Sequence, residues 1–197
     1  IVYREMINKN IKLDQHSFHN LIMIYSSANK AIEAEYLFYQ MLKANIVLKP
    51  PEMNKLITSL IKVFGRCNDL EKLKNIYQFI ITKGIKLDQY SQTMFVYAFL
   101  ELGAFEEAKA EIHKMETDGR DIDFYANIIT YYAKTNDLYN MNNYYNQMKT
   151  KNVKPNIYTY FTLLKAYAEM KNLEEGMKVH QDSLSFGFDQ NHEVLQA

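Results

Sequence analysis

Apolar and polar residues follow a helical period along this chain, and the helical segments come in pairs. The first segment of each pair contains two adjacent apolar residues, at Leu60-Ile61, Phe95-Val96, Ile128-Ile129 and Leu163-Leu164. An aromatic residue follows about one helical turn later on the same face. A short polar break, such as "RCND" or "MKN", then leads into a second helical segment. The pattern predicts a chain of helical hairpins.

Gly and Asn residues mark the end of each second segment and give the length of the repeat. They stand at Asn10, Asn45, Gly84, Gly119, Asn152 and Gly187, at spacings of 35, 39, 35, 33 and 35 residues. Both residue types tolerate the left-handed conformation of a helix C-terminal cap. Because single hairpins cannot bury an apolar face alone, we expect an all-α solenoid of about five helix-turn-helix hairpins.

A column of aromatic residues runs through the first segments at the same rhythm. Its members are Tyr25, Phe64, Phe99, Tyr132 and Tyr167. A second column, rich in methionine, precedes the Gly or Asn by four residues, at Met6, Met41, Ile80, Met115, Met148 and Ser183. Such columns are typical of core packing between stacked repeats. We expect Tyr132 and Tyr167 to be mostly buried.

Composition limits the function classes without choosing one. Of the 197 residues, 48% are apolar, which is enough for a core, and the formal net charge is zero. A zero charge gives no global field that would attract nucleic acid. Cys67 is alone, which excludes a disulfide scaffold and favours a reducing compartment. The chain begins without Met inside a helical pattern, so we expect a fragment or a mature product.

Three segments carry a family resemblance: "NIYTYFTLLKAYAEMKNLEEGMKVH", "NKLITSLIKVFGRCNDLEKLKNIYQFI" and "KNVKPN". They resemble the pentatricopeptide repeat, and the likeness extends over essentially all of the chain. The tetratricopeptide repeat is the competing hairpin family. It would place a small residue after the Leu of the first helix, where this chain has residues such as Ile61 and Val96, and an Ala where this chain has Met41. The resemblance implies a right-handed superhelix.

The resemblance divides the chain into one domain of successive units. We assign a partial repeat at 1–14, full repeats at 15–49, 54–88, 89–121, 122–156 and 157–191, and the start of a further helix at 192–197. Four extra residues, Pro50–Met53, separate the first two full repeats, and the third repeat is two residues short.

Members of this family read single-stranded RNA in organelles, one base per repeat, through two or three side chains. The resemblance assigns this role to the fifth and last residues of each repeat. The pairs are His19 with Lys49, Thr58 with Asp88, Thr93 with Asp121, Ala126 with Asn156, and Phe161 with Asn191. Met53 is an alternative to Lys49, because the insertion leaves the register open.

The two Thr/Asp pairs resemble the combination associated with guanine. A hydroxyl and a carboxylate can both accept hydrogen bonds from purine N–H groups. Ala126 and Phe161 depart from the family pattern, since neither side chain can form a hydrogen bond to a base edge. Two of the five pairs therefore follow the combination associated with guanine, and the other three depart from it.

Further residues on the same helical face are candidates for phosphate contact or base stacking. Lys62, Arg66, Lys134 and Lys165 carry positive charge there, and Tyr90 and Tyr158 hold the second position of their repeats. Lysine and arginine neutralise phosphates, and tyrosine rings stack on bases. The alternative is that the lysines form a solvated helix face and the tyrosines cover hairpin edges.

No catalytic set is visible in the sequence. His16 and His19 are spaced to share a metal, but no third ligand has suitable spacing. Glu106-Glu107 and Glu174-Glu175 open second segments, where carboxylates suit the helix dipole. We expect no enzyme activity, no cofactor, no metal and no membrane segment.

Two function classes remain. The first is an organellar RNA-binding protein acting in RNA maturation, stability or translation, or holding ribosomal RNA in the mitochondrial ribosome, with ribosomal or other organellar proteins as partners. The second is a helical scaffold that binds protein without base readout. The resemblance implies a mitochondrial location, with the plastid as the alternative. The sequence leaves open the RNA target and the oligomeric state.

Overall fold

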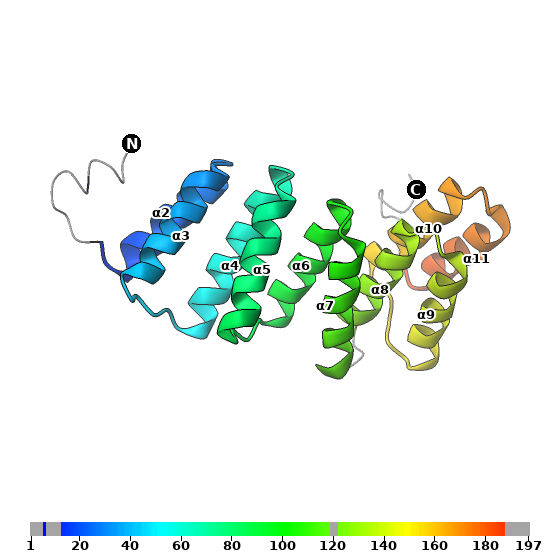
Figure 1. The fold of residues 1–197 in the computed structure, drawn as a ribbon. Coiled ribbons are helices and arrows are strands. Elements are labelled where there is room, and N and C mark those ends of the chain that lie inside the picture. Colours follow the sequence, from blue (N-terminus) through cyan, green and yellow to red (C-terminus); the bar gives the residue numbers. More distant parts are fainter. Residues whose placement is uncertain (1–5, 7–12, 119–121, 188–197) are drawn as a thin grey trace. The chain divides into compact units, whose positions relative to one another are not determined.

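The structure, a computed structural model, describes residue 6 and residues 13–118 and 122–187, and these residues contain helices and no strand (Figure 1). The helices are α2 (Gln15–Ser27), α3 (Ala31–Lys43), α4 (Pro50–Arg66), α5 (Leu70–Lys83), α6 (Gln89–Glu101), α7 (Phe105–Asp118), α8 (Ile122–Lys134), α9 (Leu138–Thr150), α10 (Ile157–Glu169) and α11 (Leu173–Ser185). The predicted all-α repeat fold is confirmed. Helices α2, α6, α8 and α10 begin at the first residue of an expected repeat.

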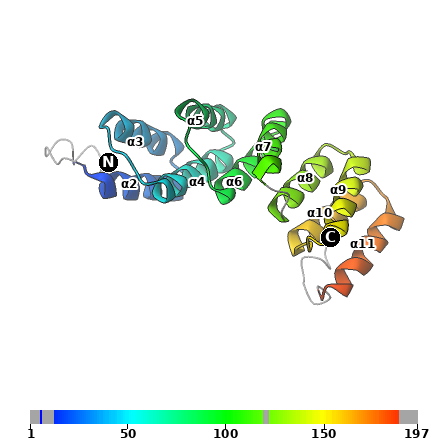
Figure 2. The same ribbon diagram turned by 90° about the horizontal axis from the view of Figure 1, so that it is seen from below.

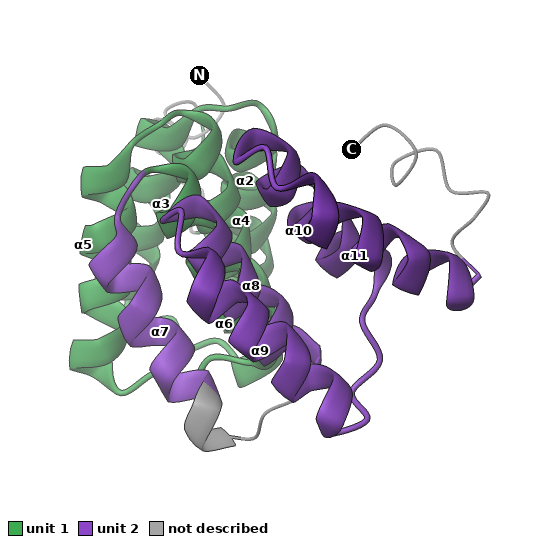
Figure 3. Ribbon diagram, turned by 90° about the vertical axis from the view of Figure 1, so that its right-hand side faces the viewer, with its two compact units in different colours: residues 1–102 green, residues 103–197 purple. Residues whose placement is uncertain are grey.

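The chain divides into two compact units, residues 1–102 and 103–197 (Figure 3). In the first unit, α4 packs against α2 on one side and α6 on the other, so that these first helices form one layer (Figure 2). Helices α3 and α5 form a second layer against them. In the second unit, α8 contacts α7, α9 and α10, and α11 packs against α10.

Side-chain caps start most of the helices. The Asp14, Asp88 and Asn156 side chains accept a hydrogen bond from the backbone N–H three residues later, at the start of α2, α6 and α10. An N-cap of this kind satisfies one of the four unpaired N–H groups of a helix start. Bonds from Ser17 also lower the pKa of the Asp14 carboxyl below its usual value. The last residue of a repeat thus has a structural duty.

Among the described residues, left-handed residues follow both the first and the second helices of the repeats. The predicted column after the second helix is confirmed at Asn45, Gly84, Asn152 and Gly187, which all have positive φ. Its other members, Asn10 and Gly119, lie outside the described residues. A further column inside the hairpins, at Asn29, Asn68, Gly103, Asn136 and Lys171, was not foreseen. These residues stop the first helix and let the chain reverse.

The core follows the predicted columns. The four apolar pairs of the first helices are buried, and so are Met41, Met115 and Met148. In the aromatic column, Phe64, Phe99 and Tyr167 are buried, and Tyr25 and Tyr132 are mostly but not fully covered. The Tyr132 ring stacks on Tyr144 with the ring centroids 5.5 Å apart.

The four-residue insertion lengthens α4 at its N-terminus. This helix has 17 residues and begins at Pro50, with Lys49 as an N-cap whose side chain makes no capping bond. Four residues are close to one helical turn, so the insertion leaves the buried face of α4 in phase with the other first helices. Proline at the first helical position is favourable, because its missing N–H would be unpaired there anyway.

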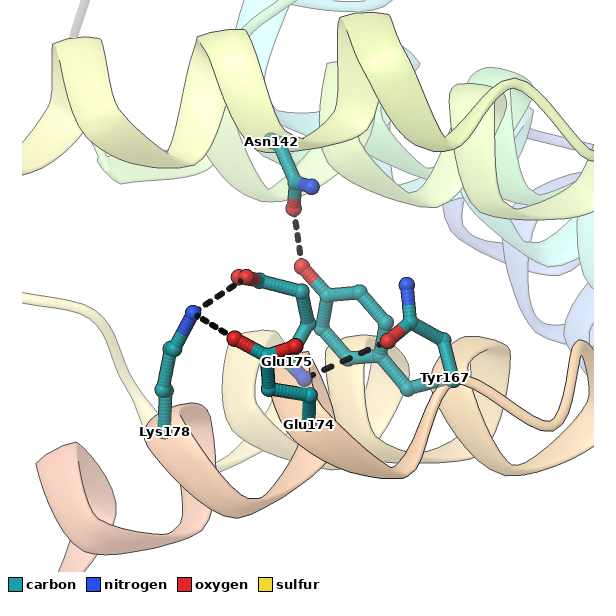
Figure 4. Close-up of polar contacts among 6 residues, drawn as sticks. Asn142, Tyr167, Glu174, Glu175 and Lys178 are labelled. Atoms are coloured by element: carbon teal, nitrogen blue, oxygen red, sulfur yellow. Dashed lines mark hydrogen bonds and ion pairs between the residues drawn. The ribbon is translucent and has the colours of Figure 1, made fainter.

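Polar contacts join α9 to α10 and also lie within α11 in the second unit (Figure 4). The Tyr167 hydroxyl of α10 donates to the Asn142 side-chain oxygen of α9. Burial, together with the negative charge of Glu175, raises the pKa of the Tyr167 hydroxyl to about 12. On α11, Lys178 forms ion pairs with Glu174 and Glu175. Tyr167 therefore serves both as a core residue and as a hydrogen-bonded tie between hairpins.

Candidate nucleic-acid interface

Two neighbouring first helices of the first unit meet along a polar line, here called the α4/α6 seam and defined by Asn54, Thr58, Lys62, Asp88, Tyr90 and Ser91. At its centre the Thr58 Oγ1 and Ser91 Oγ atoms are 3.0 Å apart. Both residues are buried, with Thr58 6% exposed and Ser91 0%. The predicted base-reading hydroxyl of Thr58 therefore faces the next repeat and leaves little surface to solvent.

The Asp88 carboxylate is exposed and contacts the backbone of Ser91, one member of this hydroxyl pair. Its Oδ1 atom accepts the Ser91 N–H at 2.8 Å, which caps α6. A carboxylate has a second oxygen, so the cap leaves acceptor capacity for a ligand. Ser91 thus contacts both members of the predicted pair, Thr58 through its hydroxyl and Asp88 through its backbone N–H.

Asn54 fixes the loop that precedes α6. Its Nδ2 group donates to the backbone oxygens of Pro50 at 3.1 Å and Lys86 at 3.4 Å. Its Oδ1 atom accepts the Asp88 backbone N–H at 3.2 Å. Since the Asn54 side chain is only 5% exposed, these bonds hold the backbone of Asp88 in a low-dielectric setting where they are strong.

Lys62 and Tyr90 form the exposed edge of the seam. The Lys62 Nζ atom donates to the Tyr90 hydroxyl oxygen at 2.9 Å and lies 5.3 Å from the ring centroid. An ammonium group so close to the hydroxyl is held by that hydrogen bond rather than by the ring face. The Tyr90 side chain remains 56% exposed. A positive charge and an aromatic surface are therefore adjacent at this edge.

The second unit contains the same register positions at the α8/α10 seam, defined by Ala126, Thr130, Asn156, Tyr158 and Thr159. The Asn156 Oδ1 atom accepts both the Thr159 N–H at 2.9 Å and the Thr159 hydroxyl at 3.0 Å. Ala126 offers no hydroxyl. The Thr130 hydroxyl donates to the Ala126 backbone oxygen of its own helix at 2.7 Å. Tyr158 is 63% exposed.

The other predicted base-reading residues lie apart from these two seams or outside the described residues. His19 on α2, Thr93 on α6 and Phe161 on α10 are partly exposed. Lys49 is exposed, and Met53, its alternative, is partly covered within α4. Asp121 and Asn191 lie outside the described residues.

The residues predicted to contact phosphates differ in the partners that their charged groups have in the structure. The Arg66 guanidinium donates to the Asn29 Oδ1 atom at 2.6 Å and to the Ser26 backbone oxygen at 2.7 Å. It thereby binds the C-terminal end of α2, where a cation suits the helix dipole. Lys165 lies 3.9 Å from a carboxylate oxygen of Glu169, and Lys134 is exposed at the end of α8.

Sequence reasoning missed Asn54, Ser91 and Thr159, which form hydrogen bonds to the last residue of a repeat, Asp88 or Asn156. A usable signal exists for the last two. Ser91 and Thr159 each stand three residues after an Asp or Asn at the last position of a repeat, which is the pattern of a capped helix start. No local pattern points to Asn54, because its partners include the backbone of Lys86, 32 residues away.

The part of the chain that the structure describes contains neither a cluster of metal ligands nor a helix suited to cross a membrane. No three His, Cys, Asp or Glu side chains gather there as metal ligands would. None of the described helices combines the length and apolarity that crossing a membrane requires.

Comparisons with known proteins point to one family. The model "PPR repeat family" matches residues 120–169, and the model "PPR repeat" matches residues 16–46 and 158–188. Together these matches cover just over half of the chain. The matched segments include α2 and α3, the α8/α10 seam and α11.

Curated relatives from Arabidopsis thaliana are also similar to the chain. One pentatricopeptide repeat-containing protein is 28% identical over 83% of this chain and 22% of its own length. A second, named mitochondrial, is 25% identical over 89% of this chain and 30% of its own length. A third, named chloroplastic, is 22% identical over 98% of this chain and 21% of its own length. The chain therefore spans less than a third of these relatives.

Solved structures share the fold. The crystal structure of the pentatricopeptide repeat protein PPR10 from maize has a TM-score of 0.72 and 17% identity, and the match covers 98% of this chain and 27% of that one. A structure of PPR10 in complex with an 18-nucleotide psaJ RNA element has a TM-score of 0.73 and 17% identity, over 98% of this chain and 28% of that one.

Proposed function

The chain belongs to the pentatricopeptide repeat family, and from this premise we propose that it binds single-stranded RNA. The α4/α6 seam carries the proposal, because it gathers four groups of complementary chemistry from two neighbouring repeats. These groups are the Asp88 carboxylate, the Thr58 hydroxyl, the Tyr90 ring and the Lys62 ammonium group. Single-stranded RNA offers base edges, base faces and phosphates to such a set.

Each group has a distinct task in this proposal. Asp88 accepts hydrogen bonds from base N–H groups, and Tyr90 stacks on a base. Lys62 neutralises a phosphate. Its ammonium group has three N–H donors, so it can bind the phosphate either after breaking the bond to the Tyr90 hydroxyl or while keeping it. Thr58, being buried, contributes only to a base that reaches into the seam.

The α8/α10 seam contributes differently. Ala126 offers no hydrogen bond, and the Asn156 Oδ1 atom already accepts two bonds from Thr159. The Asn156 Nδ2 group and the exposed ring of Tyr158 remain as the groups a base would meet. We therefore propose that base preference lies mainly in the first unit and that the second unit adds stacking and backbone contacts.

We further propose that this binding serves RNA maturation, stability or translation in an organelle, with no catalytic step by this chain. The relatives named mitochondrial and chloroplastic support an organellar role. Within this proposal the mitochondrion is favoured and the plastid is the alternative. Ribosomal RNA of the mitochondrial ribosome is one target class that fits, with ribosomal proteins as neighbours.

A binding titration tests the proposal. Fluorescently labelled single strands, one with two adjacent guanines and one with adenines in their place, are titrated with the 197-residue chain at two salt concentrations. Lys62→Ala is expected to weaken both strands alike and to lower the salt slope by about 1, because a phosphate contact carries no sequence information. Lys83→Ala, which removes another exposed lysine charge from α5, serves as the control.

Asp88→Asn tests base readout without removing the helix cap. Asn and Asp cap helices about equally well, and Asn156 occupies the same register in the second unit. We expect the guanine preference to fall roughly fivefold to tenfold, the low end of what one base-edge contact contributes. If the wild-type chain binds neither strand above background at low salt, RNA binding is wrong for this chain and the protein-scaffold function takes its place.

A further inference from the structure

Ser91 lies between the two groups to which we assign base readout at the α4/α6 seam. We propose that Ser91 is a positioning residue that holds the Thr58 hydroxyl across the seam, next to Asp88, and so determines the base preference of this repeat. The inference rests on the proposed RNA binding. Ser91 belongs to the repeat that follows the Thr58/Asp88 pair, so a repeat would borrow part of its specificity from its neighbour.

Ser91 makes contacts in three directions from a position that solvent does not reach. Its backbone N–H donates to Asp88 Oδ1 at 2.8 Å, and its hydroxyl oxygen lies 3.0 Å from Thr58 Oγ1. The Ser91 hydroxyl also lies 3.5 Å from the Asn54 backbone oxygen, a long contact in which only the hydroxyl can donate. One residue therefore touches both members of the pair and the helix that carries Thr58.

The donor order follows from the need to satisfy buried protons. If Thr58 donates to Ser91 and Ser91 donates to the Asn54 carbonyl, both hydroxyl protons have acceptors. In the reverse order the Thr58 proton would need the Asn54 carbonyl, but the contact to that oxygen comes from Ser91, and an unpaired buried donor is costly. Thr58 then presents only lone pairs to a ligand. With the carboxylate of Asp88 it forms an acceptor pair, which suits a base edge that donates N–H groups.

The alternative orientation of such a threonine is visible in the second unit. A helical threonine commonly turns its hydroxyl back to the carbonyl four residues earlier. Thr130 does so, donating to the Ala126 oxygen at 2.7 Å. For Thr58 the corresponding carbonyl is that of Asn54, yet its hydroxyl pairs with Ser91 instead. Removing the Ser91 hydroxyl should therefore release Thr58 to turn back onto its own helix, away from Asp88.

The α8/α10 seam shows how the Ser91 position responds when its partner is missing. Thr159 holds this position there, and the fifth residue of the preceding repeat is Ala126, which has no hydroxyl. The Thr159 hydroxyl turns to Asn156 Oδ1 at 3.0 Å instead. The bonding partner of the hydroxyl at this position thus depends on whether the fifth residue of the preceding repeat has a hydroxyl. It also follows that threonine fits at this position, since Thr159 is 1% exposed in an equivalent setting.

The experiment compares Ser91→Ala and Ser91→Thr in the same titration of guanine and adenine strands. Ser91→Ala keeps the backbone N–H that the Asp88 side chain caps and removes only the hydroxyl. We expect it to reduce the guanine preference about threefold to tenfold, with the salt slope unchanged, by analogy with loss of one base-edge bond. Ser91→Thr should restore the preference to within about twofold of the wild type. Ser17→Ala, at the same position of α2 with the same cap, should leave the preference unaltered.

The outcomes separate this inference from the proposed function. A purely structural Ser91 would lower the unfolding midpoint or weaken both strands alike, without changing their ratio. If Ser91→Ala binds RNA and keeps the full guanine preference, the positioning role is wrong and RNA binding stands. If Ser91→Thr fails as Ser91→Ala does, the hydroxyl is not the determinant and the inference is overturned. If the wild-type chain binds no RNA or shows no preference, the inference falls as well.

Discussion

The α4/α6 and α8/α10 seams occupy the same register of the repeat and differ in how their polar groups are shared. In the first seam, the Thr58 and Ser91 hydroxyls form a hydrogen bond between two repeats. Asp88 is bonded to Asn54 through its backbone N–H and to Ser91 through its carboxylate. In the second, Asn156 and Thr159 bond only within the start of α10. The helix cap is common to both seams, whereas the bond across the seam depends on the fifth residue of the repeat.

This difference separates two duties of the residue that ends each repeat. As an N-cap it stabilises the next helix, and either Asp or Asn can serve. As a base contact it acts together with the fifth residue, which is Thr58 in one seam and Ala126 in the other. A polar residue at the end of a repeat is therefore weak evidence for base readout by itself. The hydroxyl partner across the seam distinguishes the two cases.

The largest expected effect concerns the aromatic column of the two first helices α4 and α8. Phe64 on α4 is 1% exposed, whereas Tyr132, at the same register of α8, is partly covered and stacked on Tyr144. Phe64→Ala should cost about 3–5 kcal/mol of unfolding free energy, as for other buried aromatic residues. Tyr132→Ala should cost only about 1–3 kcal/mol, because less apolar area leaves water when this ring packs.

Chemical denaturation of both variants measures the two costs. Equal losses would mean that the rings support their seams alike and that exposure is a poor guide here. Phe64→Leu is the control, since it retains most of the apolar volume and should lose much less than Phe64→Ala.

The next effect separates the capping duty from the readout duty. Asp88→Ala and Asn156→Ala each remove an N-cap and should cost about 0.5–2 kcal/mol. Asp88→Asn should be close to neutral, because Asn caps as well as Asp. Thermal unfolding monitored by circular dichroism gives the order of the three variants. A loss in Asp88→Asn as large as in Asp88→Ala would show that the carboxylate charge, rather than the cap, stabilises α6.

The helices and their phase were predictable from the sequence because the signals are local. Apolar spacing, capping residues and left-handed Asn or Gly each act within one or two turns. The helix starts at Gln89, Ile122 and Ile157 fall at the first residue of an expected repeat for this reason. The insertion Pro50–Met53 was recognised as extra, but its conversion into a helical turn depends on what α4 packs against.

The candidate site was predictable only in part, because its geometry depends on neighbours distant in sequence. Arg66 was expected to meet phosphates, but the end of α2 lies within its reach and offers two acceptors. Thr58 was expected to face RNA, yet the seam buries its hydroxyl against Ser91. Tertiary packing decides both outcomes, and no local pattern encodes it. Lys62 and Tyr90 were both expected on the surface, and their mutual hydrogen bond was not.

A smaller effect comes from a tyrosine in α8 that has an aliphatic counterpart in α4. Tyr125 and Ile57 share a register, and both are 0% exposed. Among the described residues, the Tyr125 hydroxyl has no hydrogen-bond partner. Tyr125→Phe should therefore be neutral or stabilise the fold by up to about 1 kcal/mol, since a buried unpaired hydroxyl is unfavourable. Tyr167→Phe, which loses the bond to Asn142, should destabilise instead. A destabilised Tyr125→Phe, measured in the same denaturation assay, would point to a water bound to this hydroxyl.

The smallest effect lies in the turns that connect the paired helices. Asn68 follows α4 and Lys171 follows α10, and both adopt the left-handed conformation, with φ of 51° and 54°. This conformation costs an ordinary residue about 1–2 kcal/mol, and Asn tolerates it better through local hydrogen bonds. Lys171→Asn should thus stabilise the second unit by about 0.5 kcal/mol, whereas Asn68→Lys should destabilise the first by a similar amount. Lys171→Gly should gain less than Lys171→Asn, because glycine adds freedom to the unfolded chain. Denaturation midpoints of the three variants give the ranking. If Lys171→Asn has no effect while Asn68→Lys destabilises, the loss comes from a hydrogen bond of the Asn68 side chain in the first unit. The backbone preference of Asn would then contribute little.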